Sequence, residues 1–253
     1  MKKNLAFTLA EVLITLGVIG IVAAMTLPQL IKNFHHKVLE TKLKKSISVI
    51  YQVIQKTKDE IGVDNLTKYC TTYTKNTSNY PHREECLNIL NKNTFKSNGK
   101  KLKREKTICK SYNKKSNILI TNYTQILAGL GSRVFHTNLV PDGSFLGYEV
   151  NELSLLITVD TNGEKGPNIL GHDIFIFKMN PNNDTLGSFG IPKLYSDEEL
   201  ESEDYQYAYI KERKGYPCFT KSNQKANGIG CAYYALRDEC PDGSGRKYFE
   251  CLP

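Results

Sequence analysis

One acidic side chain is notable for its surroundings. Glu11 is the only charged residue between Lys3 and Lys32. A carboxylate inside an apolar helix is costly in lipid, by about 2.5–3.5 kcal/mol on insertion scales, so Glu11 needs a partner. The chemistry that it offers is an ion pair in an apolar setting. The natural partner is a positive charge on a neighbouring copy of the same helix.

The segment around Glu11 is long enough to cross a membrane. Phe7–Leu27 spans 21 residues and is apolar apart from its threonines and Glu11. As a helix it would extend about 30 Å, the thickness of the hydrocarbon core of a bilayer. Lys2 and Lys3 precede it without a nearby acid, which predicts a cytoplasmic N-terminus and one membrane crossing.

A segment of this composition has three common interpretations. They are a secretory signal with a cleavage site near Val22–Ala24, a plain membrane anchor, and a buried core helix. The flanking lysines argue against the buried helix. Glu11 argues against the signal and the anchor, since neither gains anything from an acid there.

The residues Ala6–Phe7–Thr8–Leu9–Ala10–Glu11 resemble the cleavage and methylation motif of type IV pilins and type II secretion pseudopilins. In that family a short basic leader is cut before a Phe, the new amine is methylated, and a Glu follows at the fifth mature position. Here the leader would be Met1–Ala6, and Phe7 would be the methylated N-terminus. Pro28 would be mature residue 22 (28 − 6), where family members often carry a helix-bending proline. Ala6 stands where the family usually has Gly.

The resemblance implies a non-catalytic structural subunit, with Glu11 and Pro28 as assembly residues. Its implied partners are other pilin or pseudopilin subunits, a prepilin peptidase, an inner-membrane assembly platform and membrane lipid. The implied location is the inner membrane and then the pilus or pseudopilus, with the C-terminal domain outside the cytoplasm. The size of that domain suggests a minor subunit.

Hydrophobic periodicity extends the helix beyond Pro28. Apolar residues recur at helical spacing from Leu27 to Ile61, and Gly62 is a plausible stop. This second half has one apolar stripe that needs a sheet to cover it. Three segments predict antiparallel strands for that sheet: Gly143–Val150, Leu153–Asp160 and Asp173–Met179. The predicted fold class is α+β, a long N-terminal helix on a small antiparallel sheet with disulfide-stapled loops.

These features predict six regions. They are the leader (1–6), a transmembrane and assembly half-helix (7–28), an amphipathic half-helix (29–61), a polar Lys-rich connecting region (62–140), the antiparallel sheet (141–191) and a Cys-rich C-terminal region (192–253).

The loop between the last two predicted strands has the oxygen donors of a calcium loop. However, its glycine falls at Gly166, one residue later than the EF-hand order requires. The sequence therefore favours a plain turn, and calcium is the alternative cofactor. Its donors would be Asp160, Asn162, Glu164 and Asp173.

All seven cysteines lie beyond residue 69, which favours disulfides in an exported domain. A metal cluster would need close CxxC pairs, and the sequence has none. Pairing of sequence neighbours gives Cys70–Cys86, Cys218–Cys231 and Cys240–Cys251 with Cys109 left over, and other pairings stay open.

The net charge of +8 comes from 34 basic and 26 acidic residues. Lys92–Lys115 alone holds ten bases and one acid. A solvated loop is the simpler interpretation of the Lys96–Lys115 cluster. The alternative function is a pilus-tip or DNA-uptake protein that binds an anionic partner there. No phosphate loop, nucleophile elbow or HExxH motif occurs, so no enzyme activity is predicted.

Overall fold

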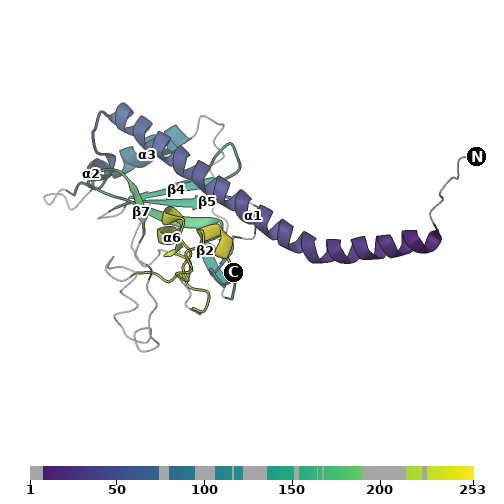
Figure 1. The fold of residues 1–253 in the computed structure, drawn as a ribbon. Coiled ribbons are helices and arrows are strands. Elements are labelled where there is room, and N and C mark those ends of the chain that lie inside the picture. Colours follow the sequence, from purple (N-terminus) through teal and green to yellow (C-terminus); the bar gives the residue numbers. More distant parts are fainter. Residues whose placement is uncertain are drawn as a thin grey trace, which may run out of the picture. The chain divides into compact units, whose positions relative to one another are not determined.

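The computed structural model describes residues 8–73, 80–94, 106–115, 117–121, 136–150, 154–163, 165–166, 168–189, 192, 215–223 and 227–253. The chain divides into two compact units, Met1–Val38 and Leu39–Pro253. Helix α1 (Leu9–Ile61) begins in the first unit and ends in the second (Figure 1).

The two parts of α1 differ in what covers them. From Thr8 to Val38 no residue is buried, whereas the part from Leu39 onward has a buried stripe. Gly62 ends the helix in the left-handed conformation (φ +80°), which is common for a glycine at a helix C-terminus. The amides of Gly62 and Val63 both donate to the Lys58 carbonyl. Pro28 lies inside the helix. The buried residues are Leu39, Glu40, Leu43, Ser46, Ile50, Val53, Ile54 and Thr57.

The second unit is built on a five-stranded antiparallel sheet in the order β3-β4-β5-β6-β7. Neighbours in sequence are neighbours in the sheet, so hairpin connections suffice. The strands are β3 (His136–Leu139), β4 (Phe145–Val150), β5 (Leu155–Asp160), β6 (Ile174–Met179) and β7 (Leu186–Ser188).

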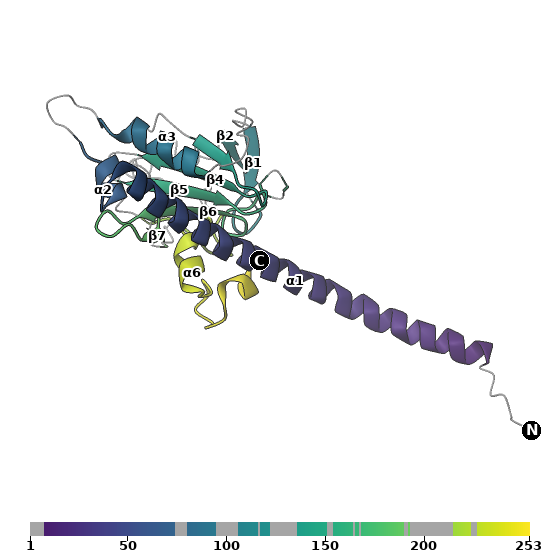
Figure 2. The ribbon, with the colours of Figure 1, turned by 90° about the horizontal axis from the view of Figure 1, so that it is seen from above.

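One face of the sheet shares its core with α1. Alternate residues of the central strands, such as Tyr148, Ile157 and Phe177, belong to the same buried cluster as Leu43 and Ile50. Helix α3 (Arg83–Thr94) contacts β3 and β4 and adds Leu87 and Leu90 to this cluster (Figure 2). Burial of this stripe is what holds the second half of α1 on the sheet.

The opposite face is also covered. Leu156 and Ile176 lie in a second buried cluster with Leu170, Tyr216 and Ile229. A separate antiparallel pair, β1 (Lys106–Lys110) and β2 (Asn117–Thr121), joins this side through a bridge from Lys110 to Ile169. Strands that are buried on both faces read as continuous apolar runs, as β5 and β6 do.

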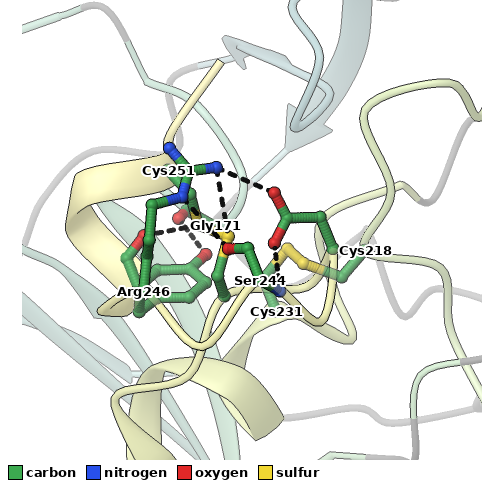
Figure 3. Close-up of a disulfide and its surroundings, with 9 residues drawn as sticks. Gly171, Cys218, Cys231, Ser244, Arg246 and Cys251 are labelled. Atoms are coloured by element: carbon green, nitrogen blue, oxygen red, sulfur yellow. Dashed lines mark hydrogen bonds and ion pairs between the residues drawn. A yellow bond between two sulfur atoms is a disulfide. The ribbon is translucent and has the colours of Figure 1, made fainter.

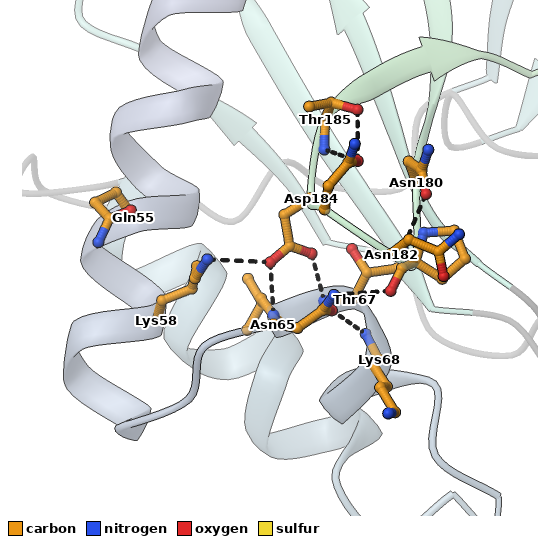
Figure 4. A network of polar contacts seen from close by, with 12 residues as sticks. Gln55, Lys58, Asn65, Thr67, Lys68, Asn180, Asn182, Asp184 and Thr185 are labelled. Carbon is orange, nitrogen blue, oxygen red and sulfur yellow. Dashed lines mark hydrogen bonds and ion pairs between the residues drawn. The ribbon is translucent and has the colours of Figure 1, made fainter.

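A buried carboxylate fastens the end of α1 to the sheet. Asp184, in the turn before β7, accepts hydrogen bonds from the amides of Leu66 (2.8 Å) and Thr67 (2.9 Å) of helix α2 (Leu66–Cys70), and lies 3.4 Å from Lys58 Nζ (Figure 4). Asn65 caps α2 and also donates to the Pro181 carbonyl at 2.8 Å. These bonds connect three elements that are distant in the sequence.

The predicted fold class is confirmed: a long apolar N-terminal helix, a small antiparallel sheet and three cysteine pairs at disulfide distance. The three predicted strands correspond to β4, β5 and β6. The region 62–140, predicted as a polar Lys-rich connecting region, contains the short helices α2 and α3 and the strands β1, β2 and β3. Helix α6 (Cys231–Arg237) and the 3-10 turn η2 (Tyr248–Cys251) complete the C-terminal region.

Candidate functional site

Thr8 and Glu11 bond each other reciprocally at the start of α1. The amide and the hydroxyl of Thr8 both donate to Glu11 Oε2 at 2.8 Å, and the Glu11 amide donates to Thr8 Oγ1 at 3.3 Å. This is a capping box, which satisfies amides that the first helical turn leaves without partners. Of the described residues, none donates to Glu11 Oε1.

The helix that follows Glu11 is apolar and uncovered. Among the described residues, α1 is the one helix long and apolar enough to cross a membrane, and none of its most apolar 18-residue window is buried. Its exposed side chains include Leu9 (79%), Met25 (75%) and Phe34 (70%). An apolar surface of this size is unusual for a protein in water and is typical of a membrane or helix-bundle contact.

The turn after β5 brings together three of the four predicted calcium donors. Asp160 Oδ1 accepts from the amides of Asn162 (3.1 Å) and Gly163 (2.9 Å). Asn162 Nδ2 donates to Asp173 Oδ2 at 2.7 Å, and the Ile169 amide donates to Asp173 Oδ1. Glu164, the fourth predicted donor, lies outside the described residues.

The same turn has a surplus of buried acceptors. Thr161 Oγ1, Asn162 Oδ1 and Asn168 Oδ1 are buried and receive no hydrogen bond within the described part of the chain. Burial and the neighbouring Asp160 carboxylate together raise the pKa of Asp173 to about 7. Oxygen donors of this kind fit calcium. In the described residues, however, no three His, Cys, Asp or Glu side chains form a group that could hold a metal ion.

Six cysteines form three disulfides: Cys70–Cys86, Cys218–Cys231 and Cys240–Cys251. These are the pairs of sequence neighbours. The last two hold the C-terminal region, where Arg246 lies 2.8 Å from Asp242 and donates to Ser244, and the Tyr248 hydroxyl donates to the Gly171 carbonyl (Figure 3). Cys109 has a free, fully buried thiol, and burial raises its pKa far above the ordinary value. It is therefore a structural side chain and not a nucleophile.

Half of the basic region Lys96–Lys115, residues 96–105, lies outside the described residues. Its described part contains β1 and ends in a turn where Lys114 donates to a carbonyl of Pro253. The cleavage residues Ala6 and Phe7 also lie outside the described residues.

Comparison with known families gives one match. The family model for the prokaryotic N-terminal methylation motif matches residues 1–27. This chain carries the type IV pilin and pseudopilin signature. No curated protein and no solved structure matches the chain.

The pilin signature covers the segment in which Glu11 is capped and the apolar helix begins. The match does not extend to residues 28–253. Sequence reasoning missed the role of Thr8, although the T-x-x-E spacing before an apolar run is a recognisable capping-box signal. It also missed Asp184, because no local pattern links that residue to α2, well over a hundred residues earlier.

Proposed function

We propose that this chain is a non-catalytic, minor structural subunit of a type IV pilus or type II secretion pseudopilus. The observation that carries this proposal is the pilin signature on an uncovered apolar helix that continues into a disulfide-bonded α+β domain. A prepilin peptidase would cut between Ala6 and Phe7 and methylate the new amine. The subunit would then wait in the inner membrane until it is assembled through α1.

The proposed orientation has the N-terminus in the cytoplasm. Lysines lie on both sides of the apolar segment, Lys2 and Lys3 before it and Lys32 and Lys37 after it, so charge alone is a weak guide. The three disulfides support export of the domain, because such bonds form and persist in oxidising compartments.

Glu11 would guide assembly. In a filament its side chain would be packed among apolar helices, where an unpaired carboxylate is expensive. The amine of Phe7 on an adjacent subunit, created by cleavage, is the natural partner. Glu11 can keep its cap through Oε2 and accept that amine through Oε1. Pairing would fix the axial register, since other offsets leave both charges alone.

The test is the ratio of filament-associated to membrane-associated protein. Glu11→Ala and Glu11→Gln are expected to insert normally and to lower this ratio several-fold, with Glu11→Asp closer to wild type. Thr8→Val is the matched variant, because it removes the cap, worth about 1 kcal/mol, and keeps the charge. Equal ratios for wild type and Glu11→Ala would refute the assembly role. A partial defect would favour a tip-proximal subunit, which lacks a neighbour on one side.

Calcium binding and DNA binding, the two alternatives that the sequence left open, differ in their support. Calcium at the Asp160–Asp173 turn is supported by the buried oxygens of Thr161 and Asn162. Bound there, it would neutralise the two carboxylates and hold the turn. DNA binding by Lys96–Lys115 gains no support from the described residues. A weak affinity of the protein for DNA that does not change with salt concentration would exclude DNA binding by this region.

A further inference from the structure

The polar side chains of the uncovered part of α1 lie along one side of the helix. With about 100° of turn per residue, five of the six polar residues between Glu11 and Asn33 fall within an arc of about 60°. All five are exposed, and Lys32 is the exception to the pattern. The five residues, which we call the polar stripe, are Glu11, Thr15, Thr26, Gln29 and Asn33.

The two threonines of the polar stripe bond their own helix. Thr15 Oγ1 donates to the Val12 carbonyl at 2.9 Å. Thr26 Oγ1 donates to the Val22 carbonyl, also at 2.9 Å. Each hydroxyl donor is therefore satisfied by the preceding turn, and the threonines alone do not require a neighbour.

The two amides of the polar stripe are only partly satisfied. Gln29 Nε2 donates to Asn33 Oδ1 at 3.1 Å, one turn farther along the helix. This bond leaves Gln29 Oε1 as an acceptor and the Asn33 side-chain N–H groups as donors. Neither makes another hydrogen bond to the described residues. Leu30 and Ile31 follow Gln29, so the amides lie at the end of the apolar span, where a polar group without a partner is costly.

A second copy of the same helix would supply the missing groups at the same level. Inserted copies share one orientation and one depth, because the same apolar span and the same flanking lysines set both. Gln29 and Asn33 of a parallel neighbour therefore lie at the same height in the membrane. Since each amide both donates and accepts, it can bond its counterpart across a two-fold axis, as polar side chains do between membrane helices.

A contact at Gln29 also keeps the Glu11 carboxylates of the two copies apart. Glu11 lies 18 residues earlier (29 − 11), which is about 27 Å along the helix. Membrane helices cross at about 20–40°, so two helices that touch at Gln29 separate toward their N-termini. The pairing therefore does not bring two negative charges together.

We propose that Thr26, Gln29 and Asn33 form a dimerisation face that binds the same face of a second copy of this chain in the membrane, before assembly. The proposal rests on the membrane insertion of α1 that the proposed function includes. Thr26 belongs to the face because it precedes Gln29 by three residues and Asn33 by seven, the spacing of a helix–helix seam. Lipid acyl chains form no hydrogen bonds, so they cannot replace the second copy there.

The test is disulfide cross-linking of single engineered cysteines in membranes of cells that lack the assembly platform and other pilin subunits. Thr26→Cys lies on the proposed face, and Ala24→Cys lies about 3 Å away along the axis and about 160° around the helix. Both native residues are small, and neither change removes an amide. Thr26→Cys is expected to give a product of twice the monomer mass, at a yield several-fold above that of Ala24→Cys. Wild type should stay monomeric, because its free thiol, Cys109, is buried.

A second pair of variants tests the amides themselves. Gln29→Leu/Asn33→Leu, added to Thr26→Cys, is expected to lower the ratio of dimer to monomer by about threefold for each interhelical hydrogen bond lost. The matched control is Gln52→Leu/Gln55→Leu, which removes two exposed amides from the same helix within the C-terminal unit. It should leave the ratio unchanged.

The outcomes separate this inference from the proposed function. Equal cross-linking of Thr26→Cys and Ala24→Cys, or an unchanged ratio in Gln29→Leu/Asn33→Leu, overturns the dimerisation face. A cross-linked product whose mass is not twice that of the monomer also overturns it, since the face would then bind a different protein. Dimer formation by a chain that keeps its N-terminal leader would support the face and refute the proposed function. Cleaved protein that enters filaments without a Thr26→Cys dimer would overturn the dimerisation face alone.

Discussion

A single oxygen of Glu11 accepts both hydrogen bonds from Thr8, so the residue caps its own helix before it meets any partner. The cap has a consequence for the isolated subunit. Its carboxylate is held at the positive end of the helix dipole, where negative charge is favourable. The hydrogen bonds from Thr8 and the helix dipole therefore both stabilise the Glu11 carboxylate within its own chain.

At the same scale, Asp173 makes stability depend on pH. Its pKa is raised from 3.8 to about 7 by burial and by Asp160, so its contribution to stability is complete below pH 4 and is lost as the pH rises through 7. Asp173→Asn is expected to remove this dependence and to be more stable than wild type at pH 8. Rotation of the Asn162 amide would let its Oδ1 accept from the new amide. Urea midpoints of the full-length protein in detergent at pH 5 and pH 8 measure this.

The same urea experiment, repeated with added calcium, tests the calcium proposal. Metal binding needs both carboxylates ionised, so calcium should raise the urea midpoint of wild type at pH 8 and leave Asp173→Asn unchanged. No change in wild type at pH 8 would contradict the calcium proposal. An identical midpoint at both pH values in wild type and variant would contradict the raised pKa itself.

At the scale of the elements, the Asp184 carboxylate joins α1, α2 and the β6–β7 turn. Asp184→Asn leaves a poorer acceptor for two buried amides and is expected to cost about 1–3 kcal/mol in the free energy of unfolding. Asp238→Asn is the matched control, since Asp184 (φ +53°) and Asp238 (φ +54°) share the left-handed conformation. Chemical denaturation compares them. An equal loss in both variants would assign the effect to the backbone and not to the bonds.

The three disulfides join short elements of the C-terminal unit to one another. Cys70–Cys86 joins α2 to α3 across a separation of 16 residues. Replacing both cysteines with Ala is expected to lower the free energy of unfolding by about 3 kcal/mol.

The free thiol gives a second prediction. In unreduced, denatured protein, N-ethylmaleimide should modify one thiol, Cys109. Three or more modified thiols would contradict this pairing.

The sequence predicted those elements whose signal is local. Gly62 marked the end of α1, and short apolar segments bounded by turn residues marked β4, β5 and β6. β1 was missed because Lys106–Lys110 lies in a Lys-rich stretch that conceals its pattern, and β7 because Leu186–Ser188 is short and contains glycine. Asp184 was missed because its partners, Lys58, Leu66 and Thr67, are brought to it only by the tertiary fold.

At the scale of the whole molecule, the two units differ in the surface that they expose. The N-terminal unit exposes apolar surface that suits lipid or neighbouring helices, and the C-terminal unit buries its own core and locks it with disulfides. The match to the methylation motif covers residues 1–27, which lie within the first unit.

The most direct test is the intact mass of the protein extracted from membranes of cells that contain a prepilin peptidase. The expected mass lacks Met1–Ala6 and carries one added methyl group on Phe7. Ala6→Gly should be processed at least as completely, since Gly is the usual residue at that position in the family. Peptidase-deficient cells provide the control and should keep the full-length mass. An unprocessed N-terminus in cells with active peptidase would contradict the assignment of this chain as a pilin-like subunit.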